Sequence, residues 1–152
     1  MSFEKLTWGV KASFRNYVEA AGGSITLSDG ATRREDGAFE FAAAAGGDLS
    51  IASDGSARGA LRFLGTVVFD AHGGMLQVTL TELGLEADAD GLVLTAPQAP
   101  RSQDRCAIAK LDRAESDTGG GVSFRAEITL DGMFQIADNY PPGTELDPVQ
   151  LD

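Results

Sequence analysis

The chain has 152 residues, of which 43% are hydrophobic and 23% are charged, and its formal net charge is −11 at pH 7. These values are typical of one globular domain, so we expect residues 1–152 to form a single domain. The negative charge argues against nucleic acid and anionic membranes as partners, because both need a cationic surface. It leaves room for a small anionic ligand that a few local cations hold.

Two further features bound the class of protein. The single cysteine, Cys106, cannot form an intramolecular disulfide, and its setting "CAIAK" favours a buried, inert thiol on a strand. No apolar run approaches the roughly 20 residues of a membrane span. The N-terminal "MSFEKLTWG" lacks the profile of a signal peptide, so the chain as written is expected to be cytoplasmic. A piece of a longer protein of the cell envelope would look the same.

The segment from Thr7 to Ala21 has the spacing of an amphipathic helix. Its apolar side chains recur every three or four residues: Val10, Phe14, Tyr17, Val18 and Ala21. Thr7 is the expected N-cap, and Gly22-Gly23 is the expected end. Ser13 precedes Tyr17 by one turn, so both side chains should project from the same face.

Beyond Gly23 the hydrophobic pattern has a period of two, with turn residues between the runs. The expected strands are Leu61–Phe69 with an interruption at Gly65, Leu76–Thr81, Leu92–Thr95, Cys106–Leu111 and Val122–Leu130. Nineteen glycines between such runs suit an antiparallel sheet with many tight turns. We therefore expect a mainly β (β-rich α+β) fold, an antiparallel sandwich or barrel-like domain with one N-terminal helix.

The C-terminal "DNYPPGTELDPVQLD" differs in composition, since it holds three of the five prolines and the second tyrosine, Tyr140. Proline fixes its own backbone and restricts the residue before it. This segment is expected to be a stiff, extended tail that lies along the body of the domain.

The single histidine, His72, stands in "VVFDAHGGMLQV", where two strands meet in a turn. It is either an exposed turn residue or a functional group. One histidine and one cysteine do not make a zinc site. The sequence also lacks a P-loop, a G-x-S-x-G elbow and a G-x-G-x-x-G turn after a strand, so a hydrolase or a nucleotide enzyme is poorly supported.

The remaining chemical groups are two tyrosines, one histidine and the serine on the face of Tyr17. Tyrosine is a known axial ligand of ferric haem, because phenolate is a hard anionic donor. A phenol ordinarily keeps its proton at neutral pH, so such a ligand needs a neighbour that accepts the proton or bonds the oxygen. The alternative for Tyr17 is a core residue of the helix whose hydroxyl reaches water.

Three segments carry a resemblance to a known family. "LTWGVKASFRNYVEAAGGSITLSDGA", "FDAHGGMLQVTL" and "YPPGTELDPV" occur in that order between Leu6 and Val149. They resemble the characteristic segments of the HtaA-type haem-binding domain of actinobacterial haem-uptake proteins.

The resemblance implies a β-rich domain that binds ferric haem b. It implies that Tyr17 is the axial ligand of the iron and that His72 hydrogen-bonds the ligating oxygen. Ser13 and Tyr140 match the residues that bind the haem propionates. Asn139 stands where the family often has an aromatic residue that packs on the porphyrin.

The resemblance thus predicts a haem-binding protein for transport, transfer or buffering in iron acquisition, and not an enzyme. Its partners would be haem and haem donor or acceptor proteins, and the sequence leaves the oligomeric state open. One alternative is a haem-dependent, peroxide-consuming enzyme, since tyrosinate also ligates the iron of catalase. Another is a β-rich module that has lost haem and binds a lipid or a protein.

Overall fold

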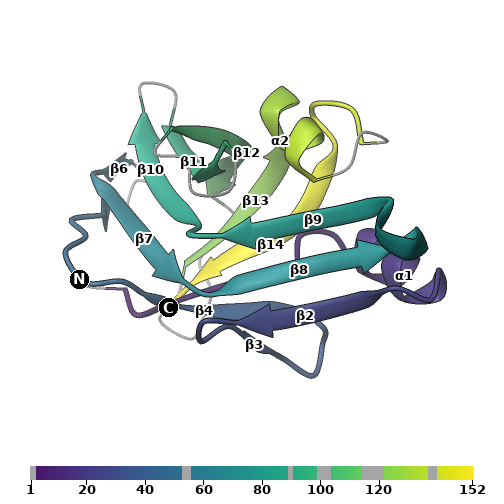
Figure 1. Ribbon diagram of the computed structural model, residues 1–152. Coiled ribbons are helices and arrows are strands. Elements are labelled where there is room, and N and C mark those ends of the chain that lie inside the picture. The colour runs from purple at the N-terminus through teal and green to yellow at the C-terminus, as the bar shows by residue number, and fades with distance from the viewer. Residues whose placement is uncertain (1–2, 53–55, 89–90, 99–103, 114–121, 137–139) are drawn as a thin grey trace.

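The computed structural model describes residues 3–52, 56–88, 91–98, 104–113, 122–136 and 140–152 (Figure 1). Its main feature is an antiparallel sheet that closes on itself. In hydrogen-bonded order the ring consists of β1 (Lys5–Trp8), β14 (Glu145–Leu151), β13 (Val122–Ile128), β12 (Arg105–Arg113), β11 (Gly91–Pro97), β10 (Gly84–Asp88), β7 (Ala60–Leu64) and β4 (Phe39–Ala43). β4 pairs again with β1 and closes the barrel. The expected mainly β fold is confirmed, and its form is a barrel.

Strand β1 forms the seam of this barrel. Leu6 lies opposite Leu151 of β14 on one side and Phe41 of β4 on the other. The backbone N–H groups of Glu4 and Lys5 both donate to the carbonyl of Asp152, at 2.7 and 3.1 Å. The two ends of the chain are therefore held in one hydrogen-bonded sheet.

The C-terminal segment is extended, as expected, but it is an internal strand of the barrel and not a tail that lies along the body of the domain. β14 lies between β1 and β13. Its side chains Leu146, Val149 and Leu151 are buried, and this apolar pattern outweighs the effect of Pro148. The prolines indicated an extended backbone correctly, but they could not indicate its neighbours.

Large side chains fill the core, as is usual for a barrel of eight strands. The fully buried aromatic residues are Trp8, Phe39, Phe41, Phe63, Phe69 and Phe124. The thiol of Cys106 is also buried on β12, as expected, and burial raises the pKa of this thiol. The interior of the barrel is therefore occupied by side chains.

A second sheet extends from the barrel (Figure 1) and consists of β2 (Ser24–Ser28), β8 (Thr66–Ala71) and β9 (Leu76–Thr81). β7 passes into β8 through Gly65, whose φ is 124° and where a Cβ would lie 2.8 Å from the Cβ of Ala31. The predicted interruption at Gly65 is thus the point where the chain leaves the barrel. The remaining short elements are β3 (Thr32–Arg33), β5 (Ser50–Ile51), β6 (Ala57–Arg58) and the 3-10 turn η1 (His72–Gly74).

Helix α1 (Ala12–Ala20) begins five residues later than expected, so the assignment of Thr7 as its N-cap is wrong. Thr7 lies in β1, because pairing with both neighbouring strands closes the barrel and outweighs the helical spacing. Val10 then takes a left-handed backbone with φ of 63°, which separates strand from helix. The end of the helix is close to the expected one: Gly23 N–H donates to the carbonyl of Val18 at 2.9 Å.

A second helix, α2 (Leu130–Gln135), was not expected, and the predicted strand Val122–Leu130 is too long at its end. The hydroxyl of Thr129 accepts a hydrogen bond from the N–H of Gly132 at 2.9 Å, so Thr129 caps α2 and stops β13. A Cβ at Gly132 would lie 2.1 Å from the carbonyl oxygen of Ile108. The glycine therefore allows α2 to pack directly on β12.

Candidate functional site

An open cavity of about 870 Å³ lies beside the barrel, between α1, the η1 turn, β9 and α2. Its lining residues are Phe14, Tyr17, His72, Met75, Leu76, Gln77, Val78, Met133, Phe134, Gln135, Ile136 and Tyr140. None of these described residues carries a carboxylate, an ammonium or a guanidinium group. Met75 and Phe134 are 91% and 72% exposed. A mostly apolar wall with a few polar groups is typical of a small-molecule site.

Tyr17 and His72 form a hydrogen-bonded pair on this wall. The Tyr17 hydroxyl oxygen lies 2.6 Å from Nε2 of His72, and the ring centroids are 5.6 Å apart. Tyr17 comes from α1 and remains 46% exposed, so its hydroxyl is open to the cavity side. The pair joins a helix to a turn that lies 55 residues further along the chain.

The backbone of the η1 turn presents His72 to α1. Three successive residues have left-handed backbones: His72, Gly73 and Gly74, with φ of 56°, 65° and 95°. A left-handed backbone is uncommon for a residue other than glycine and is a form of strain that concentrates at functional sites. His72 is exposed in a turn, as one interpretation expected, and its imidazole also contacts Tyr17.

Ser13 and Tyr140 form a second pair at another edge of the cavity. The two hydroxyl oxygens are 3.1 Å apart, and the Tyr140 ring packs edge-on against Phe14 with centroids 6.3 Å apart. The structure thus brings the four sequence-predicted residues into two hydrogen-bonded pairs. Asn139 lies outside the described residues.

A partly buried ion pair holds α1 in place, and sequence reasoning missed both partners. Nη1 of Arg15 lies 2.7 Å from Oδ2 of Asp147, and Arg15 is only 8% exposed. The other carboxylate oxygen of Asp147 accepts the N–H of Ala12, the first residue of α1, at 3.1 Å. Asp147 therefore caps the helix from β14, and the sequence gives no local signal of a contact across 132 positions.

A residue larger than glycine at position 9 would displace the side chains of this ion pair. Gly9 accepts a hydrogen bond from Nη1 of Arg15 at 2.6 Å. A Cβ at Gly9 would lie 2.3 Å from the same nitrogen and 2.8 Å from the Asp147 carboxylate. The indole N–H of Trp8 donates to the backbone carbonyl of Asp147 at 2.9 Å. The end of β1 and the beginning of α1 are therefore fixed to one residue of β14.

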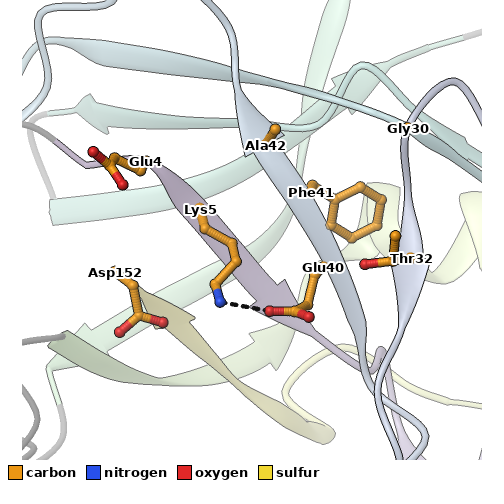
Figure 2. A pocket seen from close by; sticks show the side chains of 8 residues that line it. All are labelled: Glu4, Lys5, Gly30, Thr32, Glu40, Phe41, Ala42 and Asp152. Carbon is orange, nitrogen blue, oxygen red and sulfur yellow. Dashed lines mark ion pairs between the residues drawn. The ribbon is translucent and has the colours of Figure 1, made fainter.

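Another cavity, of about 460 Å³, lies at the barrel seam and has a different chemistry (Figure 2). Glu4, Lys5, Glu40 and Asp152 contribute charged groups to its lining. Nζ of Lys5 lies 2.6 Å from Oε2 of Glu40, and this hydrogen bond raises the pKa of Lys5. The ammonium of Lys5 and the carboxylate of Glu40 already pair with each other, and neither tyrosine nor histidine lines this cavity. We therefore place the candidate site in the larger cavity.

Two observations concern the described part of the chain as a whole. Within it, no three His, Cys, Asp or Glu side chains gather closely enough to hold a metal ion. None of its helices is long and apolar enough to cross a membrane.

The fold and the cavity define a class of proteins: closed antiparallel barrels with a ligand cavity between an N-terminal helix and a second sheet. The HtaA family model matches residues 4–152, so the chain belongs to the HtaA family. The family resemblance expected from the sequence is confirmed. No curated protein sequence matches the chain significantly.

Three crystal structures from Corynebacterium glutamicum have the same fold. The N-terminal domain of HtaA is 25% identical with a TM-score of 0.76, and the match covers 99% of this chain and 96% of that one. The C-terminal domain of HtaA is 24% identical with a TM-score of 0.71 and coverages of 98% and 95%. The haem-binding protein HtaB is 18% identical with a TM-score of 0.70 and coverages of 98% and 91%.

The substitution Asp147→Ala should destabilise the domain by about 3 kcal/mol, because it leaves the buried Arg15 guanidinium without its partner and uncaps α1. Urea unfolding at neutral pH measures this loss. The matched control is Glu19→Ala. Glu19 also lies on α1, and its carboxylate forms an ion pair with Arg33. That pair is exposed, so the control should cost no more than about 1 kcal/mol. Equal midpoints for the two variants would contradict the anchoring role of Asp147.

Proposed function

We propose that this protein binds ferric haem b in the cavity beside the barrel, with the Tyr17 phenolate as the axial ligand of the iron. The observation that carries the proposal is the 2.6 Å hydrogen bond between Tyr17 and His72 on the wall of an apolar cavity. Membership in the HtaA family and the fold shared with the haem-binding protein HtaB support it.

The residues present fit the chemistry of a haem group. Haem has a flat apolar body and two carboxylate side chains at one edge. Apolar walls such as Phe14, Val78 and Ile136 suit the body. The hydroxyls of Ser13 and Tyr140 lie together at one edge and can each donate to a carboxylate.

The Tyr17–His72 pair supplies the proton chemistry that such a ligand needs. Ferric haem, when bound, provides an iron that prefers a hard anionic oxygen donor. Tyr17 becomes this donor by losing its hydroxyl proton. His72 Nε2 accepts the proton in the tautomer that carries its own proton on Nδ1, and the N–H so formed then donates back to the phenolate oxygen. The proton thus stays between the two side chains.

The same geometry favours binding and transfer over catalysis. A peroxide-consuming enzyme needs a further acid–base side chain on the cavity wall, whereas His72 is the only histidine among the described lining residues and is bonded to Tyr17. A module for lipid or protein would use the apolar wall but has no need of the Tyr17–His72 pair. We therefore propose a role in haem transport, transfer or buffering, with haem donor or acceptor proteins as partners.

The substitution Tyr17→Phe removes only the hydroxyl and tests the axial bond. Loss of a residue that hydrogen-bonds a metal ligand typically weakens metal binding roughly 10–100-fold, and loss of the ligand itself should weaken haemin binding by more than this. The variant should also lack the visible charge-transfer band of a tyrosinate complex. Haemin titration followed by absorption measures both effects. The matched control is Tyr140→Phe, which also removes a phenol hydroxyl but should retain the band. A wild-type spectrum for Tyr17→Phe would contradict the proposal.

The role of His72 predicts a pH dependence of haem release. In the free protein a protonated His72 cannot accept the Tyr17 proton, so lowering the pH from about 8 to 5.5 should weaken haem binding and favour transfer of haem to apomyoglobin. His72→Ala should transfer haem about 10–100-fold faster than the wild type at pH 8, because its Tyr17 has no neighbour that accepts the proton.

Met75→Ala is the control for this experiment, since it truncates another cavity-lining side chain next to the same turn. It should keep the pH dependence of the wild type. Identical transfer rates for the wild type and His72→Ala across the pH range would show that His72 is only an exposed turn residue with no part in haem binding.

A further inference from the structure

Lys11 places a positive charge beside the Ser13–Tyr140 pair. It stands immediately before α1, and its Nζ lies 5.8 Å from the centroid of the Tyr140 ring. The same nitrogen donates a hydrogen bond to the backbone carbonyl of Glu145 at 2.7 Å. An ammonium group has three N–H donors, so this bond leaves two for another acceptor.

The positive charge of Lys11 contrasts with its surroundings. The chain carries a formal net charge of −11, and none of the described residues that line the cavity is a lysine, arginine, aspartate or glutamate. A ligand with carboxylates would therefore approach a negative protein and find neutral hydroxyls at the edge of the cavity. Lys11 supplies a positive charge near this edge, because its ammonium group lies over the ring of Tyr140, whose hydroxyl bonds Ser13.

The carboxylate of Asp147 on β14 reaches the first residue of α1, next to Lys11, but it already pairs with Arg15 and caps Ala12. Glu145 contacts Lys11 through its backbone carbonyl, which carries no net charge.

From these contacts we infer that Lys11 is a specificity-determining residue that selects ligands with a free carboxylate at the Ser13–Tyr140 edge. This inference rests on the proposed function and extends it, because it states which end of the ligand the protein recognises by charge. A purely structural role for Lys11, as a link between α1 and β14, predicts a different result.

The test compares two iron porphyrins, one with two charged carboxylates and one in which both are neutral methyl esters. Haemin has two carboxylates, and its dimethyl ester has none. Lys11→Gln should weaken haemin binding about fivefold, between the effect of an exposed ion pair and that of a hydrogen bond to a charged group, and leave binding of the ester unchanged. Lys11→Arg keeps the charge and should retain most of the preference for haemin. Lys110→Gln, which removes an exposed ammonium on β12, is the matched control and should change neither affinity.

The outcomes separate the hypotheses. Equal weakening of both porphyrins by Lys11→Gln would show a structural link and overturn the inference, as would no change for either. A wild-type protein that binds neither porphyrin would contradict the proposed function and the Lys11 role together. If Lys11→Gln weakens haemin binding but not binding of the ester, and the other two variants weaken neither, the result supports both the proposed function and the role of Lys11.

Discussion

The carboxylate of Asp147 joins β14 to the beginning of α1, and the position of the candidate site depends on this contact. Its two oxygens hold the Arg15 guanidinium and the first N–H of the helix at 2.7 and 3.1 Å. α1 lies outside the barrel and packs mainly against β2 and β8 of the second sheet, with Phe14, Arg15 and Val18 buried. A shift of the helix by one ångström would break the 2.6 Å contact between Tyr17 and His72.

The architecture explains why the cavity lies beside the barrel. Eight strands enclose a space that large side chains such as Trp8 and Phe41 fill, so the interior offers no room for a ligand. The second sheet leaves the barrel at Gly65 and ends in the η1 turn next to α1 (Figure 1). Helix α2 and Tyr140 supply the other wall. Elements far apart in the sequence thus form the candidate site, which would suit the proposed binding and transfer of haem.

Local patterns in the sequence predicted the elements whose formation depends mainly on neighbouring residues. Alternating side chains such as Phe124, Ala126 and Ile128 gave the strands, and Gly22-Gly23 gave the end of α1. The start of α1 was wrong because Thr7 pairs with strands that are distant in the sequence. α2 is only six residues long, too short for a helical pattern to emerge. Ser13, Tyr17, His72 and Tyr140 came from matching segments, whereas the Arg15–Asp147 contact has no local pattern that could predict it.

The most direct test of the central claim is resonance Raman spectroscopy of the ferric haem complex, made once with ordinary tyrosine and once with ring-deuterated tyrosine. Excitation into a phenolate-to-iron charge-transfer band enhances vibrations of the ligating phenolate only. Our account predicts bands that shift with the label in the wild type and that are missing when residue 17 is phenylalanine. A complex without label-sensitive bands, or one that keeps them after the Tyr17→Phe substitution, would contradict the account.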